Sequence, residues 1–350
     1  MKKELLIASA LVSTMGVAGL AEAASMSMSG NHRVGLTNTD SDSGTETRAT
    51  SMQSSIRVAV SETTDGGTTI SSGFNIANES TGAGGGNQSG LTLTFTDGSK
   101  LDLVSAGNAS GSHDVSIPSG SGEQGITVTS TNNAPTGLDF ATSATGIGFE
   151  YHTAADTMID GAKFSVSYST DTGAASTAVP VAQSHYAIGT TYVTSAGDTA
   201  VTIGAGYSTT DFANTGTQAS NDESGVHFGI SAVTGNLTVA AGLASGDTVG
   251  ATPSHEATGD VLKAGAKYVS GDLTFNLGIT AGSAKDNTTL GTAGTTEDSY
   301  DKTSASVDYV VASGVTATIG YTAVDTTDEG STVDTESNGS AWYIGANISF

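Results

Sequence analysis

The 350-residue sequence contains no cysteine, so disulfides, thiol chemistry and cysteine-ligated metals are excluded. Proline is scarce at 4 residues, which excludes a proline-rich linker. No apolar run reaches the ~18 residues that a transmembrane helix needs, so a helical membrane bundle is excluded as well. Basic residues are few, with 11 Lys and Arg against 35 Asp and Glu, and the formal net charge is −24. Such an acidic surface repels phosphate backbones, so we expect no nucleic-acid partner.

Bulky hydrophobic residues are also sparse. Leu, Ile, Val and Phe together make up just under a fifth of the chain, and a low hydrophobic fraction with high net charge is typical of disorder. Glycine, at 47 residues, is abundant. The composition therefore leaves two choices, a disordered chain or a fold that needs few hydrophobic side chains.

The first 23 residues have the pattern of a Sec-type signal peptide. A positive start at Lys2 and Lys3 is followed by a mostly apolar stretch that ends near Leu20, and then by an Ala-Glu-Ala cleavage site. A membrane anchor or a core helix is the alternative, but the apolar stretch is short and rich in Ser, Thr and Gly. We predict cleavage before Ala24, which leaves residues 24–350 as one exported domain.

Apolar and polar residues alternate with a period of two throughout the mature chain. Ile56, Val58 and Val60 share one face of such a segment, and residues 273–279 repeat the pattern with Leu, Phe, Leu and Ile. A disordered chain has no reason to keep this parity, whereas a β-strand with one apolar face requires it. The alternation therefore predicts an all-β fold.

Turn signals divide the mature chain into about sixteen strands, joined alternately by short turns and long loops. We predict strands at 26–37, 50–62, 68–78, 90–96, 99–106, 145–152, 161–169, 184–194, 198–209, 224–233, 236–246, 259–270, 271–283, 302–312, 313–325 and 338–350. An even strand number with short turns at one end and long loops at the other is typical of a transmembrane antiparallel β-barrel, whose short turns face the periplasm. A soluble β-sandwich or β-solenoid is the alternative. Eight of the ten tyrosines fall on the apolar parity, most of them near strand ends, which favours the interfacial girdle of a membrane barrel.

The last strand carries the most specific pattern. Trp342, Ile344, Ile348 and the terminal Phe350 share one face. Here the sequence resembles the general diffusion porins of Gram-negative bacteria, in particular the alphaproteobacterial type. The resemblance implies that Phe350, Ile348 and Trp342 form a signal for the barrel-assembly machinery.

The same resemblance implies a homotrimer in the bacterial outer membrane, in contact with lipid and lipopolysaccharide. Each barrel would be water-filled, with loop three (residues 107–144) folded inward to narrow the pore. The implied function is passive diffusion of small hydrophilic solutes and ions, without enzymatic activity. A surface structural or adhesin protein without a pore, and an outer-membrane enzyme with its site on the barrel rim, are the alternatives.

Parity places most basic residues on the polar face, toward the lumen. Because a cation on the lipid face near the bilayer midplane costs ~2–4 kcal/mol, this sidedness is expected of any barrel. The porin resemblance adds a constriction in which a basic ladder opposes acids of loop three. Candidates for the ladder are Arg33, Arg57, Lys100 and Lys163, with Asp114 and Glu123 as acidic partners, and Lys263 and Lys267 also face the lumen.

The acidic residues concentrate in the long loops, where they would attract cations and repel anions, so we predict a cation-preferring pore. The acidic loop with Asp328, Glu329 and Asp334 is a weak candidate for Ca²⁺, because carboxylates suit that ion but the spacing does not match an EF-hand. A solvated acidic loop is the favoured interpretation. The six histidines have no metal-ligand spacing, and we expect no resident cofactor.

Overall fold

The computed structural model describes residues 24–41, 46–78, 90–103, 107–120, 134–138, 147–170, 181–213, 223–249, 256–287, 296–329 and 334–350. Sixteen strands form a single sheet: β1 (Ser25–Ser41), β2 (Thr47–Thr63), β3 (Thr69–Asn78), β4 (Leu91–Thr94), β5 (Lys100–Leu103), β6 (Ile147–His152), β7 (Ala162–Thr170), β8 (Val181–Ala196), β9 (Thr199–Ala213), β10 (Glu223–Thr234), β11 (Leu237–Val249), β12 (Glu256–Ser270), β13 (Leu273–Asn287), β14 (Thr296–Ala312), β15 (Val315–Glu329) and β16 (Asp334–Ser349). The 3₁₀ turn η1 (Gly111–His113) lies between β5 and β6. No helix in the described ranges is long and apolar enough to cross a membrane.

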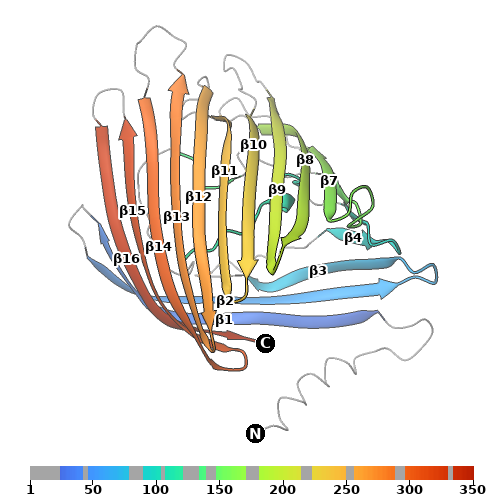
Figure 1. The fold of residues 1–350 in the computed structure, drawn as a ribbon, viewed down its shortest axis with the longest axis horizontal. Coiled ribbons are helices and arrows are strands. Elements are labelled where there is room, and N and C mark those ends of the chain that lie inside the picture. Colours follow the sequence, from blue (N-terminus) through green and yellow to red (C-terminus); the bar gives the residue numbers. More distant parts are fainter. Residues whose placement is uncertain are drawn as a thin grey trace.

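The sheet closes on itself. Each strand pairs with its neighbours in sequence, and β1 pairs antiparallel with β16 (Figure 1). At the closing seam, the backbone N–H of Phe350 donates to the carbonyl oxygen of Gly30 at 3.0 Å, and the N–H of Gly30 donates back to Phe350 at 3.1 Å. The sixteen-stranded antiparallel barrel predicted from the alternation is therefore confirmed.

A buried aromatic ring reinforces the seam from within. Tyr343 of β16 is 1% exposed, and its ring lies over Gly35 of β1 and over Gly345, where a Cβ atom on either glycine would overlap it. Its hydroxyl donates to the carbonyl oxygen of Val34 at 3.4 Å. The ring thus covers the backbone of two glycines, which have no side chains of their own to pack. Aromatic rings that cover glycines in this way help to hold paired strands in register.

The short turns gather at one end of the barrel, and each needs a glycine. All glycines with positive φ in the described residues lie in these links, namely Gly67, Gly98, Gly161, Gly197, Gly235, Gly271 and Gly314. At Gly235 (φ 55°) between β10 and β11 and at Gly271 (φ 60°) between β12 and β13, the tight reversal uses the left-handed region that other residues avoid.

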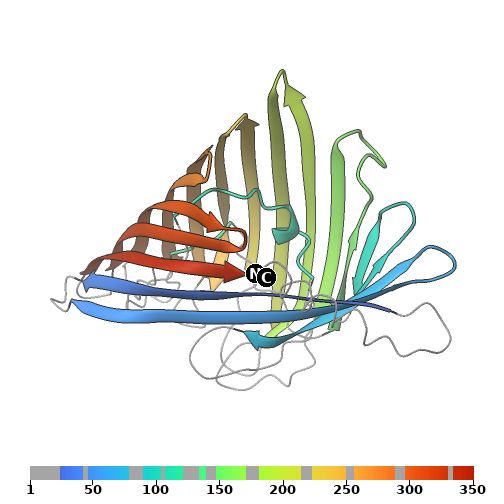
Figure 2. The ribbon, with the colours of Figure 1, turned by 90° about the horizontal axis from the view of Figure 1, so that it is seen from below.

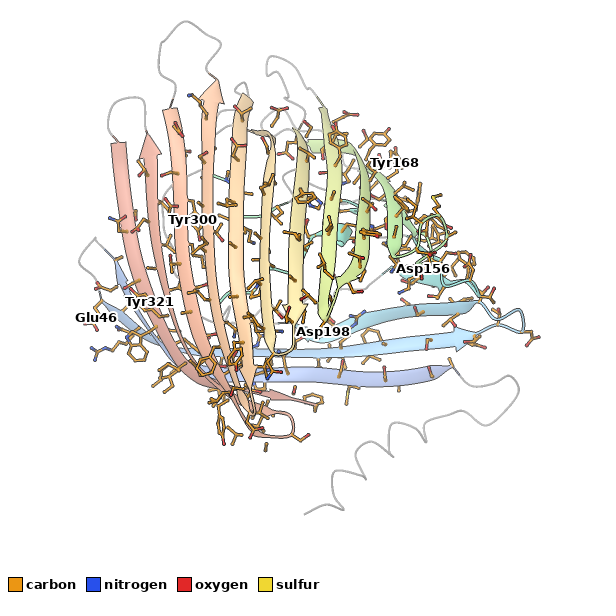
Figure 3. The ribbon with its side chains drawn as sticks, viewed as in Figure 1. Glu46, Asp156, Tyr168, Asp198, Tyr300 and Tyr321 are labelled. Carbon is orange, nitrogen blue, oxygen red and sulfur yellow. The ribbon has the colours of Figure 1, made fainter. Side chains whose placement is uncertain are left out.

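The two faces of the wall differ as the parity predicts. Leu243, Ile279 and Ile344 point outward and are each about half exposed in the isolated chain (55%, 46% and 48%). Most tyrosines lie on this outer face, among them Tyr321 and Tyr168, which Figure 3 labels. The inward positions are mainly Ser, Thr, Gly and Ala, and the one apolar cluster in the described interior joins Leu138, Ala244 and Val261 with Ile117.

Candidate pore and its inner wall

A segment of loop three lies inside the ring of strands (Figure 2). It begins against β6, where the N–H of Asn108 donates to Oε2 of Glu150 at 3.1 Å. It ends against β14, where the N–H of Gly120 donates to Oγ of Ser304 at 2.9 Å. Residues 107–120 therefore cross the inner wall from β6 to β14, and they occupy space that an empty barrel would leave to water.

Glycines of the wall make this close approach possible. A Cβ atom on Gly189 would overlap the carbonyl oxygen of Ala109, and one on Gly204 would overlap that of His113. We call the inner-wall glycines in contact with loop three the glycine track; its members are Gly189, Gly204, Gly206, Gly229, Gly242, Gly259, Gly265, Gly278 and Gly282. Because these residues lack side chains, the backbone of the loop rests directly on the backbone of the sheet.

The register of the sheet aligns several of these glycines across neighbouring strands. Gly204 pairs with Gly229, Gly229 pairs with Gly242, and Gly265 pairs with Gly278. Paired residues point to the same side of the sheet, so glycines from neighbouring strands open one groove across the wall. The abundance of glycine in the composition is explained in part by this groove.

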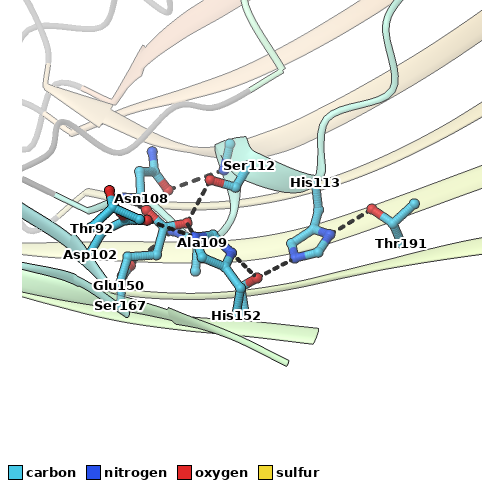
Figure 4. A network of polar contacts seen from close by, with 12 residues as sticks. Thr92, Asp102, Asn108, Ala109, Ser112, His113, Glu150, His152, Ser167 and Thr191 are labelled. Atoms are coloured by element: carbon cyan, nitrogen blue, oxygen red, sulfur yellow. Dashed lines mark hydrogen bonds and ion pairs between the residues drawn. The ribbon is translucent and has the colours of Figure 1, made fainter. Parts of the chain in front are cut away.

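A carboxylate fixes the first turn of the segment. Besides Asn108, Glu150 accepts a hydrogen bond from the hydroxyl of Ser112 at 2.5 Å (Figure 4). The neighbouring N–H of Ala109 donates to Oγ of Ser167 on β7 at 2.9 Å. Hydrogen bonds to a charged acceptor are stronger than neutral ones, so Glu150 is the main polar anchor at this end.

His113 forms a second anchor. Its side chain is 3% exposed, with Nδ1 2.6 Å from Oγ1 of Thr191 and Nε2 2.7 Å from Oγ of Ser165. The same Ser165 oxygen lies 2.7 Å from Nδ1 of His152, whose Nε2 lies 3.2 Å from Oδ2 of Asp102. Figure 4 shows this chain of contacts, which links loop three to β8, β7, β6 and β5.

Burial, together with smaller electrostatic effects of His152, Lys163 and His227, lowers the pKa of His113 from 6.5 to about 4. His113 is therefore neutral at physiological pH. A neutral ring has one donor and one acceptor nitrogen, which suits two hydroxyl partners, since a hydroxyl can take either role.

His227 of β10 holds the following residues of the loop. Its Nε2 donates to the carbonyl oxygen of Ser110 at 3.0 Å, and its Nδ1 lies 3.2 Å from Oδ1 of Asp114. The ring is buried between loop and wall. Glu150, His113 and His227 together pin residues 108–114 at three points.

A cavity of about 850 Å³ opens beside this network, between loop three and the wall from β4 to β8. Its walls carry Lys100 and Lys163 together with Asp102, His113 and His152. Asp156 lines it as well, so the cavity presents two ammonium groups beside two carboxylates and two imidazoles, a polar lining that water and small solutes can share.

The comparisons with known proteins agree with this geometry. The model of the Gram-negative porin family matches residues 8–350. The chain belongs to the Gram-negative porins. A search of curated proteins finds no significant match. Family and fold make the molecule an outer-membrane channel protein, so the porin resemblance of the sequence and the outer-membrane location are confirmed.

Solved structures of the same fold share little sequence with this porin. They include an anion-selective porin from Comamonas acidovorans (TM-score 0.61, 13% identity, 93% of this chain and 100% of that chain covered). They also include OmpT, an outer membrane protein of Vibrio cholerae (0.60, 14%, 95% and 99%), and a substituted variant of the Rh. blastica porin (0.58, 15%, 93% and 100%). At these identities the similarity shows the fold alone.

The residues predicted for the constriction lie in two places. Lys100 and Lys163 meet at the large cavity. Arg33 and Arg57 lie apart from it on β1 and β2, where Nη1 of Arg33 donates to Oε1 of Gln53 at 3.4 Å. Asp114 faces His227, whose Nδ1 lies 3.2 Å from its carboxylate. Glu123 lies outside the described residues, so the constriction stays a prediction.

The other predicted sites are placed in part. Phe350, Ile348 and Trp342 point outward, and they are 62%, 43% and 43% exposed. Glu329 and Asp334 face each other in the backbone register at the ends of β15 and β16, but their side chains and that of Asp328 lie outside the described residues. Among the side chains that the structure does describe, no group of three or more His, Asp or Glu could hold a metal ion. The signal peptide predicted at 1–23 also lies outside the described residues.

Sequence reasoning missed the histidine anchors, although all six histidines were examined for metal spacing. His113, His152 and His227 are 39 and 75 positions apart and meet only because loop three turns inward. One signal was present in the sequence. Glycines recur on the inward parity of β8 to β13, at positions where an ordinary lumen wall accepts any polar side chain.

Proposed function

We propose that this porin is a passive diffusion channel for small hydrophilic solutes and ions, without enzymatic activity. The observation that carries the proposal is the docking of loop three on the glycine track. The segment 107–120 lies flat on the wall from β6 to β14 and narrows the lumen. Barrels of sixteen strands are wide enough to enclose an aqueous channel, so the lumen stays open beside the loop.

We further propose a preference for cations. The chain carries 35 acidic and 11 basic residues, and many of the acids lie at the strand ends opposite the short turns, among them Asp40, Glu223 and Asp247. A mouth of one charge sign raises the local concentration of the opposite ion. Lysines and arginines on the inner wall, including Arg57, Lys100 and Lys163, moderate the preference.

Assembly as a homotrimer is supported by a polar pair on the outer wall. Nδ1 of His32 lies 2.8 Å from Oγ of Ser54, in the row of β1 and β2 positions that faces away from the lumen. A polar pair in contact with lipid is unfavourable, whereas a neighbouring barrel can shield it. We propose that this face meets another copy and that the remaining outer surface contacts lipid and lipopolysaccharide.

Export by a signal peptide at 1–23 and insertion by the barrel-assembly machinery complete the proposal. Calcium bridging at Asp328, Glu329 and Asp334 is retained as a minor proposal, supported by the backbone pairing of Glu329 with Asp334. Removal of calcium with a chelator should lower the melting temperature of the assembled protein if these carboxylates share an ion. An unchanged melting temperature contradicts the calcium site.

Reconstitution into a planar lipid bilayer tests the main proposal. The porin should give stepwise conductance in triplets, and the zero-current potential in a KCl gradient should have the sign of cation preference. An impermeable protein overturns the channel, and the opposite sign overturns the cation preference.

Two single arginine variants refine the selectivity test. Arg57→Gln removes a charge predicted to face the lumen and should strengthen cation preference. Arg48→Gln is the matched control, because Arg48 is exposed and paired with Glu46 at 2.8 Å beside the long loop that precedes β2. Equal effects of the two variants contradict a role for Arg57 in the pore.

A further inference from the structure

A second, smaller cavity of about 180 Å³ lies under loop three on the opposite side of the barrel from the histidine network. It is enclosed between residues 117–119 and 136 of the loop and the inner wall of β12, β13 and β14. Lys263 of β12 and Lys302 of β14 both line it. Neither lysine has a role in the contacts that fix loop three, so the cavity is independent of that network.

The two lysines are brought together by the register of the sheet. Lys263 pairs with Thr280, and Thr280 pairs with Lys302, so the three residues form one row across three strands on the inner face. Two interstrand spacings separate the lysine backbones by about 10 Å. Long flexible stems allow both ammonium groups to reach a ligand above Thr280.

The cavity lining contains no carboxylate. Besides the lysines it consists of apolar groups, glycine backbone and the hydroxyls of Ser119, Thr136, Thr280, Tyr300 and Ser304. Within the described part of the chain, neither Lys263 nor Lys302 forms an ion pair. The two ammonium groups therefore face one small cavity whose described lining supplies no acidic counterion.

The hydroxyls supply donors that complement the charges. Oγ of Ser304 accepts the N–H of Gly120 at 2.9 Å, which leaves its own O–H to donate to another group. Lysine ammonium groups and hydroxyl donors around a small space are a combination that suits an oxyanion, and lysine is a common phosphate ligand.

We propose that this cavity binds a small oxyanion of the phosphate class between Lys263 and Lys302. The volume corresponds to about six water molecules at about 30 Å³ each, which is enough for one tetrahedral anion and a few waters. The anion offsets the repulsion between the two ammonium groups, which is stronger in a partly enclosed site than in bulk water. It also receives hydrogen bonds from loop three and from the wall, so its binding holds the two together.

The proposal rests on the proposed function only in that the lumen gives the anion access. Binding is therefore measured without current. Calorimetric titration of inorganic phosphate into the detergent-solubilised porin should show one site per barrel, and chloride at the same ionic strength should give no comparable heat. Failure of conduction in bilayers, with phosphate binding intact, would overturn the channel and leave this site standing.

The lysine variants give the decisive comparison. Lys263→Gln and Lys302→Gln should each weaken phosphate binding about tenfold or more, because each removes a charge-assisted contact. Lys267→Gln is the matched control, since Lys267 lies four residues further along the same face of β12, opposite Asn276, and does not line the cavity. Its phosphate affinity should stay near that of the parent.

Two results would overturn the proposal. One is that the parent protein binds no phosphate. The other is that Lys267→Gln weakens binding as much as the cavity variants, which indicates a general charge effect. Circular dichroism and heat-modified gel mobility, recorded for every variant, separate loss of the site from loss of the fold.

Discussion

Gly265 of β12 lies so close under Pro118 that a Cβ atom on the glycine would overlap the carbonyl oxygen of the proline. The overlap involves backbone on both sides, so neither partner can rotate away. Similar contacts recur along the glycine track. The position of loop three in the lumen is therefore determined largely by where the wall lacks side chains.

Gly265→Ala should displace loop three or destabilise the barrel. Overpacking of this kind typically costs about 1–3 kcal/mol. We expect the folded band on gels to convert to the unfolded band at a lower temperature. We also expect an altered single-channel conductance. Gly66→Ala is the control, because the nearest atom to a Cβ there is 3.9 Å away. Equal behaviour of the two variants would contradict the track.

Tyr343→Ala should weaken the seam between β16 and β1. Loss of a buried aromatic ring costs about 3–5 kcal/mol, and here it also uncovers Gly35 and Gly345. The urea midpoint of unfolding in detergent should fall accordingly. Tyr343→Phe keeps the ring and removes the hydroxyl, whose hydrogen bond to Val34 is long, so it should cost less than about 1 kcal/mol. A large loss in the Phe variant would mean that the hydroxyl, not the ring, stabilises the seam.

The barrel itself was predictable because it depends on local information. Parity along each strand reports which face meets lipid, and the turn glycines mark the reversals, so strand number and the outward position of Trp342 and Phe350 follow from the sequence. The shortest strands, β4 and β5, have four residues each; β4 was predicted too long, at 90–96, and residues 104–106 at the predicted end of β5 lie outside the described residues. Few residues carry the pattern there, so the boundary is weakly specified.

For the site inside the barrel, the sequence predicted which side chains face the lumen but not which of them contact loop three. Lys100 and Lys163 were placed on the lumen face by parity, and they do meet at one cavity. The partners of His113 were not predictable, because Ser165 and Thr191 lie 52 and 78 residues away and the contact depends on the path of a loop across the wall. The alternation of apolar and polar residues does not predict the path of a loop.

Acidification should loosen the anchor at His113. The pKa of the docked ring is about 4 because of burial, with added effects of His152, Lys163 and His227, against an ordinary value of 6.5. Above about pH 6.5 both docked and released rings are neutral, and pH has no effect on docking through this group. Between 6.5 and 4 a released ring takes up a proton that the docked ring does not, so docking weakens as pH falls.

Conductance noise or hydrogen exchange of residues 107–120, recorded from pH 8 to pH 4, measures this loss. His113→Gln retains hydrogen-bonding groups but cannot be protonated, so its profile should be flatter over the same window. A parent profile that matches the Gln variant would assign the pH response to groups other than His113.

Phe350→Ala should separate assembly from stability. The substitution keeps the backbone hydrogen bonds between residue 350 and Gly30 but removes the ring that the proposed assembly signal requires. Insertion catalysed by the barrel-assembly machinery should slow markedly, whereas spontaneous refolding in detergent should change little, because the ring is 62% exposed and lies over Gly30, which has no side chain. Phe350→Tyr, which retains an aromatic ring, should insert at nearly the parent rate. If the Ala variant fails equally in both assays, Phe350 acts by closing the barrel at Gly30 and not as a recognition signal.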